Sequence, residues 1–113
     1  MRNMSLLLGM VLLAALAIGC DDDGLGAPCE RDSDCPSDDC RTGRDYPGGI
    51  CTTSCRNSAD CPDDWACVEK GGGTCLRYCT SDGSCRDRFG SGWACKNEKL
   101  EGEGGNISVC RGD

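Results

Sequence analysis

Residues 55–75 read CRNSADCPDDWACVEKGGGTC, and this stretch decides the fold. It opens with C-x5-C and closes on a fourth cysteine, and the same plan recurs before it at 29–51 and after it at 79–110. In chain order these units are repeats 1, 2 and 3. The C-x5-C spacing and the three-residue linkers between repeats never vary, whereas the later spacings do, as expected of loops on a fixed framework. The framework cysteines are Cys29, Cys35, Cys40, Cys51, Cys55, Cys61, Cys67, Cys75, Cys79, Cys85, Cys95 and Cys110.

Other residues recur in phase with the cysteines. Asp-Cys-Pro occurs at 34–36 and 60–62, and Trp-Ala-Cys at 65–67 and 93–95. Each repeat is therefore predicted to be an acidic turn followed by a small β-hairpin, since glycines supply the positive φ of tight turns and β-branched residues suit strands. In repeat 2 the predicted strands are 67–69 and 74–75. No stretch beyond Ile18 carries a sustained 3.6-residue apolar period, so no helix is expected there.

The predicted fold is small and disulfide-rich: three short β-hairpin/loop repeats with little regular secondary structure, after an N-terminal helical signal segment. Four cysteines in a repeat allow three pairings. First-to-third with second-to-fourth is favoured, because it joins both hairpin strands to the preceding turn; pairing between repeats is left open. The favoured pairs are Cys29–Cys40, Cys35–Cys51, Cys55–Cys67, Cys61–Cys75, Cys79–Cys95 and Cys85–Cys110.

Aromatic side chains are too few for a large apolar core. After Cys20 the chain has only five, among them Trp65 and Trp93. Thirteen cysteines in 113 residues are typical of a disulfide scaffold, in which each bridge contributes about 2–4 kcal/mol. The two tryptophans are expected to cover the disulfides as a miniature core. The alternative is that they are exposed anchors for a partner.

The N-terminus is typical of an export signal. Arg2 supplies a positive charge and an apolar segment runs from Met4 to Ile18, which has the length of a secretory signal and is short for a membrane span. The residues that follow, Leu-Ala-Ile-Gly-Cys at 16–20, resemble the lipobox of bacterial lipoproteins. The resemblance implies a signal peptide at 1–19 and lipidation of Cys20. Removing Cys20 from the count also leaves twelve cysteines, an even number. An ordinary secretory signal is the alternative.

Residues 20–28 would then form the lipidated cysteine and a flexible acidic tether, because they contain three aspartates, two glycines and a proline. From Cys29 to Cys110 the cysteine spacing resembles the Cys-rich repeats of uncharacterised bacterial lipoproteins, which are likened to the N-terminal cysteine-rich domain of Dickkopf proteins. Dickkopf proteins bind receptor ectodomains. That activity is not carried over, because no contact residue of theirs matches here.

The charge and the residue types of the chain argue against two classes of function, nucleic-acid binding and catalysis. All nineteen acidic residues follow Cys20, and nothing forms a basic stripe, so nucleic acid is not an expected partner. The chain has no histidine, which removes the usual general base and the Ser-His and Cys-His pairs. An enzyme is therefore not expected, and no cofactor is predicted.

A metal centre is not predicted either. Zinc modules usually contain C-x2-C pairs, and this chain has none. Aspartates in the acidic turns offer oxygen ligands for calcium, although no calcium-loop motif is present. Whether calcium binds there is left open for Asp32, Asp34, Asp60, Asp63 and Asp64.

The chain ends with Arg111-Gly112-Asp113, an integrin-recognition tripeptide that short sequences contain by chance often enough to weaken the inference. The leading hypothesis is a non-enzymatic binding or structural module of a Gram-negative cell envelope. The membrane would be contacted through lipid on Cys20, at the outer membrane or its periplasmic face rather than the inner membrane. Loops such as 41–50 and 96–109 would meet an unidentified protein or glycan. The alternative is a secreted or surface-displayed effector or adhesin that uses the tripeptide.

Overall fold

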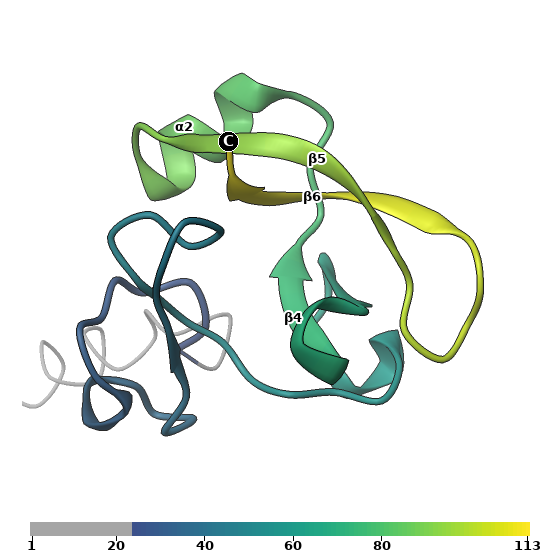
Figure 1. The fold of residues 1–113 in the computed structure, drawn as a ribbon, viewed down its shortest axis with the longest axis horizontal. Helices are drawn as coiled ribbons and strands as arrows, with labels where there is room; N and C mark the ends of the chain where they lie inside the picture. Colours follow the sequence, from purple (N-terminus) through teal and green to yellow (C-terminus); the bar gives the residue numbers. More distant parts are fainter. Residues whose placement is uncertain (1–23) are drawn as a thin grey trace, which may run out of the picture.

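The computed structural model describes residues 24–113 (Figure 1). Each repeat contributes one two-stranded antiparallel sheet, in which the third and fourth cysteines lie directly opposite each other: Cys40 and Cys51, Cys67 and Cys75, Cys95 and Cys110. The elements are the 3-10 turns η1 (Asp32–Asp34), η2 (Ser58–Asp60) and η3 (Lys70–Gly72), the strands β1 (Cys40–Arg41), β2 (Ile50–Cys51), β3 (Trp65–Val68), β4 (Thr74–Arg77), β5 (Trp93–Lys99) and β6 (Asn106–Gly112), and the helix α2 (Asp82–Phe89). The structure therefore confirms the disulfide-rich class built from small hairpins.

Six disulfides join the hairpins to their turns. In every repeat the first cysteine bonds the third and the second bonds the fourth, which is the pairing that the sequence favoured. Within residues 24–113 every bridge stays inside its own repeat. The opposed cysteines of each hairpin thus reach back to two different points of the preceding turn, which fixes the hairpin against it.

The expectation that no helix follows the signal segment is wrong for Asp82–Phe89. Helix α2 buries only Cys85 among its residues, so it has no apolar stripe for a period search to detect. Its N-terminus is capped by Ser81, whose hydroxyl accepts the Ser84 N–H, and Cys85 is bonded to Cys110 of β6. The Ser81 cap and the disulfide to Cys110 stabilise this helix in place of an apolar face.

Linkers between repeats continue the strand pairing from one repeat to the next. Thr53 accepts the Cys75 N–H at 3.1 Å, and Tyr78 forms an antiparallel bridge with Val109 of β6. Residues 26–27 do the same for repeat 1, where Gly26 donates to Cys51 at 2.8 Å. Leu25 is buried in the main core. The prediction of a flexible tether is thus wrong for residues 25–28, because an apolar side chain and backbone hydrogen bonds dock them onto repeat 1.

Four aromatic residues, Tyr46, Trp65, Phe89 and Trp93, belong to a core shared by all repeats. Trp65 and Trp93 are 5% and 2% exposed and pack with Phe89, Leu25, Ile50 and several disulfides. Phe89 lies between the two indoles, with ring centroids 6.4 Å from Trp65 and 4.8 Å from Trp93. The miniature core was predicted correctly, and the alternative of exposed anchors is wrong because both rings are buried.

The three repeats form one body. The β5–β6 hairpin runs along one side, and the loop between its strands curves down beside repeat 2 (Figure 1). There Leu100 pairs with Val68, and Glu101 donates its N–H to Cys67 at 2.9 Å. The end of β6 meets repeat 1, since the Gly112 N–H donates to Asp45 at 2.7 Å. Repeat 3 therefore contacts both of the other repeats.

Candidate functional site

Side chains of the acidic turns accept backbone hydrogen bonds from the hairpins that follow them. The residue three places after the first cysteine accepts the backbone N–H of the third cysteine in every repeat: Asp32 from Cys40 at 2.8 Å, Ser58 from Cys67 at 3.1 Å and Asp82 from Cys95 at 2.8 Å. Sequence reasoning missed this hydrogen bond, because Ser replaces Asp in repeat 2. The signal that could have revealed it is that all three repeats have, three places after the first cysteine, a short side chain whose oxygen can accept a hydrogen bond.

A second set of turn carboxylates accepts the backbone N–H groups of residues that directly follow the first cysteine. Asp34 accepts the N–H groups of Glu30 and Arg31 at 3.0 and 3.2 Å, and Asp60 accepts that of Arg56 at 2.9 Å. The two backbone donors lower the pKa of the Asp34 carboxyl, because they favour its ionised form. These carboxylates have a structural task that requires no metal.

The cysteines gather in threes, with sulfurs within 4.8 Å of one another, for example Cys29, Cys35 and Cys51. This closeness follows from the stacking of two disulfides in each repeat. A disulfide sulfur is not a thiolate and is a poor zinc ligand.

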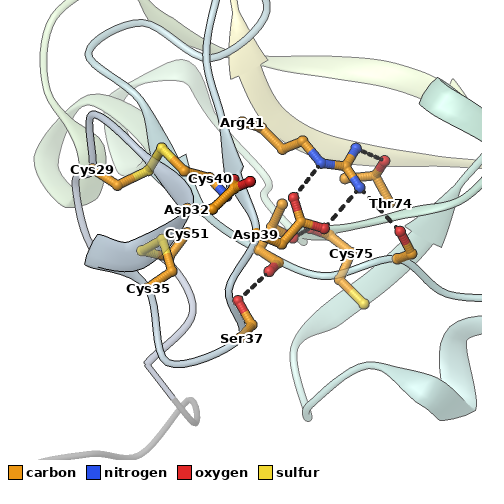
Figure 2. Close-up of polar contacts among 12 residues, drawn as sticks. Cys29, Asp32, Cys35, Ser37, Asp39, Cys40, Arg41, Cys51, Thr74 and Cys75 are labelled. Carbon is orange, nitrogen blue, oxygen red and sulfur yellow. Dashed lines mark hydrogen bonds and ion pairs between the residues drawn. A yellow bond between two sulfur atoms is a disulfide. The ribbon is translucent and has the colours of Figure 1, made fainter.

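Arg41 links repeat 1 to repeat 2. Its guanidinium donates to both carboxylate oxygens of Asp39 at 2.7 and 3.1 Å, to the Thr74 hydroxyl at 2.7 Å and to the Ser54 hydroxyl at 3.2 Å (Figure 2). The hydrogen bond to Asp39 is the largest cause of a raised Arg41 pKa. Asp39 stands where the other repeats have alanine before the third cysteine, so this departure from the repeat creates an inter-repeat contact.

A cluster of four charges joins all three repeats. Lys70 of repeat 2 lies 3.1 Å from Asp45 of repeat 1 and 3.9 Å from Glu98 of repeat 3. Arg111 lies 2.8 Å from Glu98 and 3.5 Å from Asp45. Each cation contacts both carboxylates. The four side chains are 16–38% exposed, so the cluster is partly accessible to water. The cluster positions the repeats relative to one another.

The Arg-Gly-Asp tripeptide is part of this internal framework. Arg111 forms an ion pair with Glu98 in the charge cluster, and Gly112 is buried and donates its N–H to the Asp45 carbonyl. Asp113 pairs with Lys96 at 3.0 Å, which lowers the pKa of its carboxyl. A Cβ on Gly112 would overlap the Arg44 carbonyl. The tripeptide is therefore held by the hairpin and repeat 1 instead of forming an open loop.

The two loops predicted to meet a partner are partly used within the molecule. In 41–50, Asp45 and Pro47 accept hydrogen bonds from Gly112 and Trp93 of repeat 3. In 96–109, Leu100 and Glu101 lie against repeat 2. Exposed residues remain at 42–44 and 102–106. Part of each loop is therefore an inter-repeat contact.

A concavity of about 210 Å³ lies where repeat 2 meets repeat 3. It is lined by the buried half-cystines Cys79 and Cys110 and by two arginines, an aromatic ring and two hydroxyls: Arg77, Tyr78, Thr80, Ser84 and Arg88. Tyr78 is 47% exposed and is the one large apolar side chain classed as exposed in the part of the chain that the structure describes. Sequence reasoning missed this site, because its residues come from β4, a linker and α2.

Cys20, the predicted lipidation site, and the predicted signal peptide at 1–19 lie outside the described residues. Within 24–113 no helix is both long and apolar enough to cross a membrane. Comparison with protein-family models, with curated proteins and with solved structures finds no match for this chain. The structure defines its class as a disulfide-rich protein of three hairpin repeats, and the likenesses to lipoproteins and Dickkopf domains stay predictions.

Proposed function

We propose that this chain is a non-enzymatic lipoprotein of a Gram-negative cell envelope, anchored through Cys20, whose rigid body binds a protein or glycan partner. The lipobox-like residues 16–20 support the anchor, and six disulfides suit the oxidising periplasm. We place the anchor in the outer membrane or at its periplasmic face in preference to the inner membrane.

The docking of Leu25 limits how far the body can lie from its anchor. Five peptide units separate Cys20 from Leu25, and an extended chain spans at most about 18 Å over that distance. Lipid on Cys20 would therefore keep repeat 1 close to the membrane surface. A partner that is also held in the envelope would be met at high effective concentration.

The observation that carries the binding role is the cross-linking of the body by disulfides and by contacts between the repeats. Disulfides fix each hairpin, and Arg41, Lys70 and Arg111 join the repeats. A body ordered before it meets its partner loses little conformational entropy on binding. The adhesin alternative receives less support, since Arg111 and Asp113 are paired internally.

The anchor is tested by intact-mass spectrometry of the protein purified from its native envelope. The expected mass corresponds to cleavage before Cys20 plus acyl chains, with a gain of about twelve hydrogens on reduction of six bridges. The Cys20→Ala variant should lose the acyl mass and leave the membrane fraction. An unlipidated wild-type mass would overturn the anchor.

The binding role is tested by cross-linking in intact cells followed by affinity purification of the full chain. A specific envelope component should be retained from wild-type cells. Retention of none, at several cross-linker lengths, would contradict a binding role. For the adhesin alternative, Asp113→Ala should abolish adhesion of host cells if the tripeptide is used, and unchanged adhesion would remove it.

A further inference from the structure

We propose that repeat 3 contains a thiol–disulfide exchange relay, through which an external thiolate switches its two bridges to a second pairing. The inference goes beyond the proposed binding role and does not depend on lipid at Cys20. In the native pairing Cys79 is bonded to Cys95, and Cys85 is bonded to Cys110. In the second pairing the first cysteine of the repeat bonds the second, and the third bonds the fourth.

The two bridges of repeat 3 differ in their accessibility to solutes. Cys95 is half-buried, whereas its partner Cys79 is 5% exposed. The cysteines of the other bridge, Cys85 and Cys110, are 0% and 2% exposed. Access to the sulfur is one of the factors that set the rate of thiol–disulfide exchange. A small external thiolate therefore reacts first at the Cys95 sulfur, forms a mixed disulfide there and releases Cys79 as a thiolate.

The released Cys79 lies next to the second bridge. The sulfurs of Cys79, Cys85 and Cys95 all lie within 4.8 Å of one another, and Cys85 is the member of this group that belongs to the second bridge. Groups held this close react at a high effective concentration. The Cys79 thiolate attacks the Cys85 sulfur, so that the Cys79–Cys85 bond forms, the Cys85–Cys110 bond breaks, and Cys110 leaves as a thiolate.

The register of the hairpin completes the exchange. Cys95 of β5 lies directly opposite Cys110 of β6. Opposed Cα atoms of antiparallel strands are about 4.5–5.5 Å apart, which falls within the span of a disulfide. The Cys110 thiolate attacks the Cys95 sulfur, forms the Cys95–Cys110 bond and expels the external thiolate. The protein begins and ends with two bridges in this repeat, so no electrons are gained or lost and the external thiol is a catalyst.

The second pairing removes the bridge that holds α2 against β6. Phe89, the last residue of α2, packs between Trp65 and Trp93 in the shared core. After the exchange, the cysteine of α2 is tied only to the first cysteine of its own repeat. The helix then loses its covalent link to the hairpin, and the aromatic core becomes more accessible to water. The relay therefore couples the thiols that surround the protein to the exposure of its core.

The test uses the full chain with Cys20→Ala, in which all twelve remaining cysteines are bridged. A catalytic amount of reduced glutathione is added, free thiols are blocked with iodoacetamide, and the chain is unfolded and digested with trypsin. Trypsin cuts after Arg77, Arg86, Arg88, Lys96, Lys99 and Arg111. The native pairing therefore joins peptides 78–86, 89–96 and 100–111 in one product.

The second pairing gives a different set of peptides. Peptide 78–86 should be released with an internal Cys79–Cys85 bridge, and peptides 89–96 and 100–111 should be joined by Cys95–Cys110. The two products should appear together within minutes to hours, in about 1–10% of molecules, the range of a minor state a few kcal/mol above the major one. The isomer, separated by chromatography, should have tryptophan emission at longer wavelength than the native form.

Cys110→Ser isolates the central step, because it leaves Cys85 as a free thiol within 4.8 Å of Cys79. Cys85 should displace Cys95 from Cys79 without any added thiol, since the attack is intramolecular. The matched control combines Cys85→Ser with Cys110→Ser, so it lacks the same bridge but has no free thiol. Labelling of Cys95 by iodoacetamide should be more than about tenfold higher in the single variant than in this control.

Two outcomes would overturn the relay. One is that glutathione, over a range of concentrations, only reduces bridges or joins different repeats and never releases peptide 78–86 with an internal bridge. The other is equal labelling of Cys95 in the single and double variants. If Cys110→Ser does not fold, the glutathione experiment on the parent chain decides alone.

Discussion

The indole N–H of Trp93 donates to the backbone carbonyl of Pro47 at 3.0 Å and so joins repeat 3 to repeat 1 across 46 positions of the chain. Trp65, on the other side of Phe89, has no hydrogen-bond partner for its buried indole nitrogen among residues 24–113. Two tryptophans at matching places in their repeats thus differ in one interaction.

Phenylalanine at these two positions should have unequal effects. Both Trp93→Phe and Trp65→Phe remove similar apolar volume, but only the first leaves a part-buried carbonyl without its donor. Trp93→Phe should therefore lower the free energy of unfolding by about 1–2 kcal/mol more than Trp65→Phe. Denaturant unfolding of both variants with intact disulfides measures the difference. Equal losses would show that the Pro47 contact contributes nothing.

Two adjacent glycines with nearly equal φ provide a test of crowding. Gly48 and Gly49 have φ of +78° and +79°. A Cβ at Gly48 would meet nothing within 4 Å, whereas a Cβ at Gly49 would overlap the Cys29 carbonyl. Gly48→Ala should cost about 1–2 kcal/mol from the left-handed backbone alone. Gly49→Ala should cost at least about 2 kcal/mol more, because the turn must also move away from Cys29.

The readout for this pair is the yield of correctly bridged protein after oxidative refolding, together with the unfolding midpoint. Gly49→Ala should form the Cys29–Cys40 bridge poorly, since the clash is with the backbone of Cys29. Similar refolding yields for the two variants would mean that the chain relaxes around the added methyl group.

Removing the Arg41 guanidinium should loosen repeat 1 from repeat 2. Arg41→Gln leaves Asp39, 25% exposed, without its cation and breaks the bond to Thr74. The expected loss in unfolding free energy is about 1–3 kcal/mol. Arg41→Lys should restore only part of it, because an ammonium cannot make the paired contact. Hydrogen exchange should rise at Cys75, whose N–H is bonded to Thr53 of the adjoining linker.

Arg44→Gln is the control for this prediction, because Arg44 is exposed in the same repeat and its change should stay within about 0.5 kcal/mol. Equal losses for Arg41→Gln and Arg44→Gln would show that the effect is one of net charge and not of the hydrogen bonds.

Acid should weaken the turn of repeat 1. The pKa of the Asp34 carboxyl is lowered in the folded protein by the N–H groups of Glu30 and Arg31. A lowered folded pKa contributes stability that is fully present above the unfolded value of about 3.9 and is lost as pH falls through the folded pKa. Carbon-detected NMR should place the Asp34 titration below that unfolded value.

The Asp34→Asn variant removes this titration, so its stability should depend less on pH in the acid range than that of wild type. Asp63→Asn is a suitable comparison, since Asp63 is an exposed aspartate in the turn of repeat 2. If both variants have the same acid dependence, the backbone hydrogen bonds of Asp34 do not contribute to the acid stability.

Several features follow from sequence because they are local. The pairing was favoured from the order of cysteines within about 11–25 positions, and the hairpins from glycines between β-branched residues. Helix α2 was missed because its stability comes from the Ser81 cap and the Cys85–Cys110 bridge, neither of which leaves an apolar period. Leu25 was missed because the residues before it are acidic and suggest a tether.

The concavity between repeats 2 and 3 could not be predicted from the sequence, because no single residue that lines it belongs to a recognisable motif. Arg77, Tyr78 and Arg88 belong to a strand end, a linker and a helix. They line one concavity because Tyr78 pairs with Val109 and the Cys79 N–H donates to Ser108, which places the linker against β6.

The sequence by itself determined the repeats, their hairpins and the class of the fold, because disulfide geometry and tight turns act over short stretches of chain. Only the tertiary structure decided that the repeats form one body, that the Arg-Gly-Asp tripeptide is internally paired, and that a concavity lies where repeat 2 meets repeat 3. Those properties depend on contacts between side chains and backbone groups far apart in the chain, such as Arg41 with Thr74 and Trp93 with Pro47. Cysteine spacing does not encode them, because it constrains each repeat and not the packing between repeats.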